Sequence, residues 1–407
     1  MNNSIRNLII EEIAGSIDIP DTSYEAAHAR YRDLGEWFGR AEARAHAFEP
    51  HSYSQGSFRL GTVIRPVEDD GEYDLDMGCC LMVGVTKATH TQEELKHLIG
   101  ADLEGYCIAR GIKEKLEEKN RCWRLKYADK LKFHLDTVPS IPETAERRQL
   151  IQAAIVGTGA PAELAKLVAS LTGAITDNRM RNYRIINNAW RLSNSEGFAR
   201  WFESRMKLSR ALMERLPLQA KAANLDELPI YRWKSPLQRC VQLLKRHRDI
   251  MFADSPDGKP ASIIITTLSA EAYRGETEIA DALETILSNM RRLINTTSPR
   301  VPNPVNPAED FADRWSDTIS LHLNMEKKFL LWLQQARLDF DVIGREHKPE
   351  PIVTAARDKL GVSLNAKDLC TKLENCSAAG LLKPAVVPVA LNFPDKPLIP
   401  KKPAGFA

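Results

Sequence analysis

Two acidic residues stand at the start of an apolar strand. Asp74 and Asp76 flank Leu75 in the segment YDLDMGCCLM, which runs on into apolar residues. Because side chains two residues apart on a strand point to the same face, both carboxylates share one face. An isolated pair of this kind is usually a solvated strand end, but the apolar run indicates that this strand enters a core. Two carboxylates so close repel each other unless a hard cation such as Mg²⁺ lies between them.

A third acidic residue lies on a later strand. Asp136 interrupts the alternating segment LKFHLDTVPS, in which Pro139 would end the strand. A buried aspartate needs a partner, and a salt bridge to Lys132 or Arg124 would satisfy it without any catalytic role. The alternative is that Asp136 joins the first two acids in one site.

A glycine and a serine precede the acidic loop. Gly56 and Ser57 end one β-type run at a turn into a helical one, where backbone N–H groups and a hydroxyl can hold phosphate oxygens. Together with paired acids on the next strand and a lone acid on a later one, this is the pattern of the nucleotidyltransferases related to DNA polymerase β. In their chemistry, two metal ions held by three carboxylates activate a hydroxyl and neutralise the leaving group.

The flanking residues narrow the resemblance. QGSFRLGT, a Pro-containing acidic loop and then YDLDMG resemble the bacterial cGAS/DncV-like nucleotidyltransferases (CD-NTases) of anti-phage CBASS systems, which make cyclic oligonucleotides. The resemblance implies an α+β fold: a polymerase-β-like core with a mixed sheet, a C-terminal helical lobe, and the active site in the cleft between them. It also implies catalytic acids that bind two Mg²⁺ ions, with Mn²⁺ as a substitute, and residues that bind the nucleotide. The acids are Asp74, Asp76 and Asp136, the last also as general base or metal relay; the nucleotide ligands are Gln55, Gly56 and Ser57.

The helical lobe should then supply a lysine for the same triphosphate. The sequence predicts a helix with Ser235 as N-cap and Pro236 in its first turn. Lys245 on this helix belongs to the densest basic patch in the chain and is the candidate. The alternative is a solvated basic helix face.

A serine and an aromatic residue from the lobe are expected at the nucleotide as well. Ser262, which opens the run after a Gly-containing loop, is the candidate serine. Tyr273 is the candidate for stacking on a base, although Tyr231 and Trp233 are equally well placed by sequence. We expect His134 to be a neutral, hydrogen-bonded histidine rather than a metal ligand.

The pattern of hydrophobic residues divides the chain. Residues 22–47 have the spacing of one long amphipathic helix that lies outside both main parts, and helices dominate from residue 196 onward. We expect a spine helix region at 1–48, a nucleotidyltransferase core at 49–205, a helical lobe at 206–382 and a Pro-rich, flexible tail at 383–407.

Charge and cysteine usage limit the partners. The 56 Lys and Arg residues nearly balance the 54 Asp and Glu residues, which argues against a long nucleic acid as ligand. The 7 cysteines form no CxxC pair, so we expect reduced thiols in a cytoplasmic protein and no zinc site. We expect no signal peptide in MNNSIRNLIIEEIAGS, and no apolar stretch reaches the ~20 residues that cross a membrane.

The resulting interpretation is a template-independent synthase. A 3′- or 2′-hydroxyl of one nucleotide attacks the α-phosphate of ATP, GTP or another nucleoside triphosphate, pyrophosphate leaves, and a cyclic di- or trinucleotide activates an effector protein. One alternative is an RNA-end nucleotidyltransferase, and another is an inactive nucleotide-binding scaffold. The tail, which ends in AGFA, resembles those that a ubiquitin-conjugation-like partner joins to a target.

Overall fold

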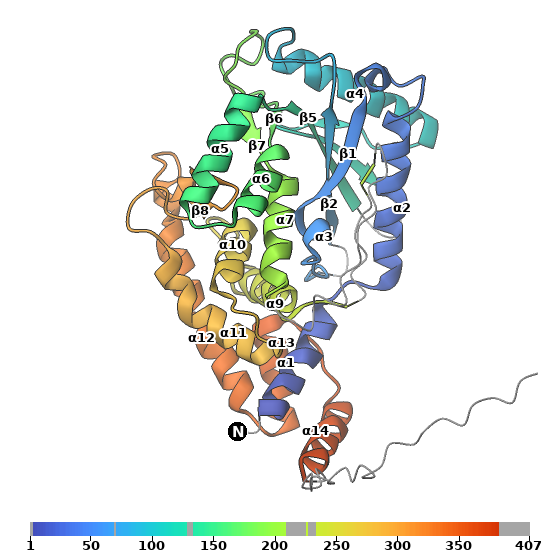
Figure 1. Ribbon diagram of the computed structural model, residues 1–407. Helices are drawn as coiled ribbons and strands as arrows, with labels where there is room; N and C mark the ends of the chain where they lie inside the picture. Colours follow the sequence, from blue (N-terminus) through green and yellow to red (C-terminus); the bar gives the residue numbers. More distant parts are fainter. Residues whose placement is uncertain (1–2, 69–70, 128–132, 209–224, 227–232, 382–407) are drawn as a thin grey trace, which may run out of the picture.

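A computed structural model describes residues 3–68, 71–127, 133–208, 225–226 and 233–381 (Figure 1). The expected tail at 383–407 and the alternative candidates Tyr231 and Lys132 lie outside these residues. The α+β fold class expected from the sequence is confirmed. None of the described helices combines the length and apolar character needed to span a membrane.

A seven-stranded mixed sheet forms the centre of one half of the molecule. Its main path runs in the order β1-β2-β5-β4-β3, and β6 joins β5 to β7. Strands β2 and β5 are parallel and the other pairs are antiparallel. The strands are β1 (Pro50–Gln55), β2 (Tyr73–Leu81), β3 (Glu117–Glu118), β4 (Trp123–Tyr127), β5 (Phe133–Pro142), β6 (Gly173–Ile175) and β7 (Arg191–Ser193).

Strand β2 enters the core as its sequence predicts. Leu75, Met77, Cys79 and Leu81 are all 0% exposed, whereas Asp74 at the mouth of the strand is exposed. Helices pack around this sheet or connect its strands: α2 (Asp21–Phe38), α3 (Gly56–Leu60), α4 (Gln92–Arg110), α5 (Ala145–Gly157), α6 (Ala162–Ser170) and α7 (Ser195–Met206).

The second half is helical. It contains α9 (Pro236–Met251), α10 (Ser262–Ala272), α11 (Ile279–Asn289), α12 (Met325–Arg345), α13 (Pro349–Leu360) and α14 (Ala366–Leu381). A short hairpin of β8 (Pro302–Asn303) and β9 (Asn306–Asp310) and the short helix η3 (Asp313–Trp315) precede α12.

The N-terminal region differs from the expected single helix. Helix α2 ends at Phe38, where Gly39 follows, and a short 3₁₀ helix occupies Arg44–Phe48. Helix α1 (Asn3–Ile17) packs on the helical half, and α2 packs on the sheet, as Figure 1 shows. The N-terminal helices therefore contribute to both hydrophobic cores, and the expectation that the first helix lies outside both is wrong.

Candidate active site

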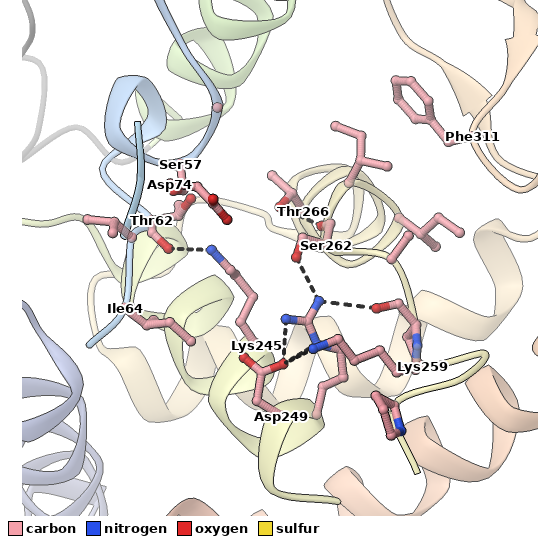
Figure 2. Close-up of a pocket in the computed structure, with 18 of the residues that line it drawn as sticks. Ser57, Thr62, Ile64, Asp74, Lys245, Asp249, Lys259, Ser262, Thr266 and Phe311 are labelled. Atoms are coloured by element: carbon pink, nitrogen blue, oxygen red, sulfur yellow. Dashed lines mark hydrogen bonds and ion pairs between the residues drawn. The ribbon is translucent and has the colours of Figure 1, made fainter. Parts of the chain in front are cut away.

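A cavity of about 900 Å³ lies between the start of β2 and helices α9 and α10 (Figure 2). Its walls come from segments far apart in the sequence. Six of the predicted site residues line it: Gly56, Ser57, Asp74, Asp76, Lys245 and Ser262.

The Gly-Ser turn is fixed by a close approach to a carboxylate. Strand β1 runs antiparallel to β2 and places Gln55 opposite Asp76. Gly56, the next residue, has φ +67°, and a Cβ there would lie 2.0 Å from Asp76 Oδ2. Glycine is therefore required both by the left-handed backbone and by the neighbouring acid. Gln55 itself is buried at the N-terminus of α3 and is not among the residues that line the cavity.

We expect Gly56→Ala to abolish most of the activity of this site. The added methyl group must displace Asp76, in addition to the ~1–2 kcal/mol cost of the left-handed backbone. Gly111→Ala is the matched control, because Gly111 has φ +63° but no atom within 4 Å of its Cβ position. Turnover and thermal melts of both variants check this: similar melts are expected, with activity lost only in Gly56→Ala. Equal activity of the two variants would show that the close approach of Gly56 to Asp76 is not needed for activity.

The register of the parallel strands brings the second and third acids together. Asp76 on β2 lies opposite Asp136 on β5, and Asp74 lies opposite His134. Removal from water, and then the charges of Asp136 and Asp74, raise the pKa of Asp76 to about 7. A divalent cation would stabilise the ionised form of a carboxyl whose pKa is raised by burial and by neighbouring acids.

Asp136 already has a cationic partner. Its two oxygens accept hydrogen bonds of 2.7 Å from Nε and 2.7 Å from Nη2 of Arg124. The predicted alternative of a salt bridge to Arg124 is thus correct, and Asp136 is not among the residues that line the cavity. His134 pairs with Glu72 and has Asp74 at 3.7 Å.

The donors fit a hard divalent cation in part. Asp74 and Asp76 are carboxylates on one side of a cavity that also contains the Ser57 hydroxyl, which suits Mg²⁺ together with phosphate oxygens. Within the described residues, however, no three His, Cys, Asp or Glu side chains form a group that could hold a metal ion as they stand.

Helix α9 carries the predicted lysine into the cavity. Ser235 is its N-cap and forms a capping box with Gln238, with Pro236 in the first turn, as the sequence predicts. Lys245 is 8% exposed, and its Nζ donates a 2.9 Å hydrogen bond to the Thr62 carbonyl. Burial, and then the charge of Arg248, lower the pKa of Lys245 to about 8. The alternative of a solvated basic face is therefore wrong at this position.

Arg248 is a site residue that the sequence marked only as part of a basic patch. It lies one helical turn after Lys245 and lines the same cavity. Its Nη1 donates a 2.6 Å hydrogen bond to Ser262 Oγ, and its Nη2 contacts Asp249 Oδ1 at 2.7 Å (Figure 2). Lys259 also contacts Asp249, at 3.1 Å. Ser262 is thus held by a buried guanidinium at the cavity wall.

Tyr273 does not reach the cavity. It is 0% exposed in the core of the helical half, and its hydroxyl donates a 2.7 Å hydrogen bond to the Glu276 carbonyl. The prediction that it stacks on a base is wrong, because its side chain is enclosed in the core of the helical half and does not line the cavity. Phe311 and Trp315, from the segment between β9 and α12, line the cavity instead, and the alternative candidate Trp233 does not.

Comparison with known proteins shows similarity to a nucleotidyltransferase domain and to cyclic dinucleotide synthases. Residues 50–139 match the family model described as cyclic GMP-AMP synthase DncV-like, nucleotidyltransferase domain. A c-di-GMP synthase of Roseivirga ehrenbergii is 29% identical over 332 residues, which cover 80% of this chain and 74% of that protein. The cyclic dinucleotide synthase CdnG of Bradyrhizobium diazoefficiens is 25% identical over 338 residues, 78% of this chain and 73% of that protein. The solved structure of the Bradyrhizobium diazoefficiens CD-NTase CdnG in complex with GTP has the same fold, with a TM-score of 0.61 and 21% identity over 92% of this chain and 99% of that one.

Proposed function

This chain carries a nucleotidyltransferase domain of the DncV-like CD-NTase family, and on that premise we propose that it synthesises a cyclic dinucleotide from nucleoside triphosphates. The names of its two curated relatives, a c-di-GMP synthase and a cyclic dinucleotide synthase, support this product class. The observation that carries the proposal is the cavity itself. It joins the Gly-Ser turn and two acids of the sheet to a buried lysine and a half-buried serine of the helical half.

GTP is the substrate that we propose first. One relative is named for a product made of two guanine nucleotides, and CdnG was solved in complex with GTP. The aromatic side chains of Phe311 and Trp315 line the cavity and supply flat apolar faces of the kind that nucleotide bases stack on.

The triphosphate is proposed to lie between the two halves. Backbone N–H groups at the start of α3 and the Ser57 hydroxyl can donate to its oxygens. Lys245 and Arg248 bring two buried positive charges from α9, and such charge-assisted hydrogen bonds are the strong ones. Arg248 also fixes the direction of the Ser262 hydroxyl, which it contacts at 2.6 Å.

Asp74, Asp76 and Asp136 are the residues proposed to hold divalent metal, Mg²⁺ or Mn²⁺. When bound, such ions lower the pKa of an attacking hydroxyl and neutralise the charge of departing pyrophosphate. The protein's own part is to keep Asp74 and Asp76 on one face of a rigid strand, with Asp136 opposite Asp76 on the neighbouring strand. Gly56 leaves the room that Asp76 needs.

The biological setting is proposed from the resemblance to CBASS enzymes. We expect a cytoplasmic protein whose cyclic product activates an effector during anti-phage defence. All seven cysteines are free thiols, as a reducing compartment requires. Conjugation of the tail remains a proposal that rests on its sequence alone.

The direct test is a product assay. The purified protein is incubated with all four ribonucleoside triphosphates and Mg²⁺ or Mn²⁺, treated with phosphatase and analysed by mass spectrometry. We expect a phosphatase-resistant product with the mass of c-di-GMP. A resistant product with other bases would keep the reaction and correct the substrate, and a linear, phosphatase-sensitive extension would favour RNA-end modification. No product, together with no thermal protection by GTP, would contradict the proposed function.

A further inference from the structure

We propose that Arg124 is a latch on the third carboxylate of this site: it holds Asp136 in the metal-free protein and must release it before Asp136 can bind a divalent cation. The inference rests on the proposed function, because only a metal-dependent reaction needs Asp136 as a metal ligand. It adds a residue that controls how readily the carboxylates accept a metal.

The latch is built into the register of the sheet. Arg124 on β4 lies directly opposite Asp136 on β5, and Asp136 lies opposite Asp76 on β2. On its other side, Arg124 lies opposite Glu117 on β3. Residues that pair across strands project from the same face, so these four side chains form one row in the order Asp76, Asp136, Arg124, Glu117.

Arg124 forms a bidentate salt bridge with Asp136. Both carboxylate oxygens accept hydrogen bonds from one guanidinium, at 2.7 Å and 2.7 Å. The same guanidinium has Asp74 Oδ1 at 4.0 Å, so it also borders the acid at the cavity mouth. A bidentate arginine occupies one lone pair on each carboxylate oxygen and places its positive charge where a divalent cation would approach.

Arg124 and a divalent metal ion compete for Asp136 because both are positively charged. A guanidinium and a divalent cation repel each other strongly at a few ångströms in a partly buried site. Arg124 and Lys245 are the positive groups that partly offset the raised pKa of Asp76, so Arg124 helps to stabilise the acids while no metal is bound. As the acids stand with Arg124 in place, they form no three-ligand group within the described residues.

Glu117 provides a second acceptor for the released guanidinium. The Arg124 side chain is 27% exposed and that of Glu117 is 33% exposed, so neither is locked into the core. Lys119 and Lys126 already contact Glu117, each at 2.6 Å. Glu117 therefore attracts Arg124 only moderately, and we expect its removal to have a smaller effect than the removal of Arg124.

The test measures Mn²⁺ binding without nucleotide or turnover. Full-length wild type, Arg124→Gln, Arg124→Lys and Glu117→Gln are titrated with Mn²⁺, and the free ion is followed by electron paramagnetic resonance. We expect Arg124→Gln to bind Mn²⁺ about tenfold or more tightly than wild type, because one cation fewer faces the metal. The Mn²⁺ affinity of Arg124→Lys should lie between those of wild type and Arg124→Gln, since an ammonium keeps the charge but cannot form the bidentate hydrogen bond. Glu117→Gln should bind a few-fold more weakly than wild type, and should have no effect when Arg124 is also changed.

A double-mutant cycle with Asp136→Asn locates the effect. If Arg124 acts by occupying Asp136, the gain from Arg124→Gln should largely disappear when Asp136 is already asparagine. Thermal melts show whether each variant folds; if Arg124→Gln does not, Arg124→Lys carries the comparison and must still bind Mn²⁺ more tightly than wild type.

Unchanged or weaker Mn²⁺ binding by the folded Arg124 variants would overturn the latch, because Arg124 would then only position Asp136. That result is distinguishable from failure of the proposed function. Product formation by the wild type with unaltered Mn²⁺ affinities rejects the latch alone, whereas tighter Mn²⁺ binding by Arg124→Gln supports it whatever product the wild type makes.

Discussion

The double substitution Asp74→Asn, Asp76→Asn is expected to abolish product formation while the melting temperature stays within a few degrees of wild type or rises. Both side chains keep their size and lose their charge. The two asparagine amides carry no negative charge, so they bind a divalent cation far more weakly than the two carboxylates. The chemistry that such a cation supplies is therefore lost. The fold should tolerate the change, because Asp76 is crowded by Asp136 and Asp74.

The pKa of Asp76 predicts how the difference in melting temperature between the double variant and wild type changes with pH. Burial and the two neighbouring acids raise the pKa of Asp76 to about 7, whereas an unfolded Asp titrates near ~3.9. Between these values the folded state binds the proton more tightly than the unfolded state does, so this group destabilises the fold as the pH rises through that range. The double variant lacks the group. Its melting temperature relative to wild type should therefore increase between pH 5 and pH 8, as differential scanning fluorimetry can measure.

Asp33→Asn is the matched control for the loss of one carboxylate. Hydrogen bonds from Arg110 hold the pKa of Asp33 below its usual range, so this acid stabilises the fold when ionised, the opposite of Asp76. Asp33 lies on α2, and it is not among the residues that line the cavity. The control should keep its activity and lose some stability. A double variant at the cavity that unfolds, instead of folding without activity, would support a structural role for Asp74 and Asp76.

Local patterns predicted the parts of the site that lie within one element. The alternation around Leu75 placed two acids on one face of a strand, and the pair Ser235 and Pro236 marked the first turn of α9. Such signals need only neighbours in the sequence. They also predicted that Lys245 would face the cleft, because its position follows from the helix that those caps begin.

Signals that depend on tertiary packing were missed or misplaced. Tyr273 and Phe311 are both aromatic residues next to a secondary-structure element, and only the packing of the helical half decides that Tyr273 is buried in its core while Phe311 lines the cavity. Asp136 had two interpretations, a salt bridge to Arg124 and membership of the acid cluster. The structure pairs it with Arg124 and places it opposite Asp76. The register between distant strands supplies this result, and no single segment encodes it.

Lys245→Ala is the second large effect that we expect. Removal of this buried charge should raise the apparent KM for the nucleoside triphosphate about tenfold to a hundredfold, the range of a charge-assisted hydrogen bond. The melting temperature at pH 7 should stay within a few degrees, for two opposing reasons. The hydrogen bond to the Thr62 carbonyl is lost, but so is the cost of keeping an ammonium in a site that lowers its pKa to about 8.

The lowered pKa makes the same prediction testable by pH. Below about pH 8 the Lys245 side chain is protonated and attracts the triphosphate, and above it the side chain becomes neutral in the free enzyme. The kcat/KM of the wild type should therefore fall as the pH rises through about 8, and Lys245→Ala should lack this fall. Lys259→Ala is the matched control, because Lys259 lines the same cavity but is 42% exposed at its side chain and pairs with Asp249. Its KM should change little, since an exposed charge is screened by water and salt. An unchanged KM in Lys245→Ala, or an equal effect in the control, would place the triphosphate away from α9 and leave the Gly-Ser turn as its main support.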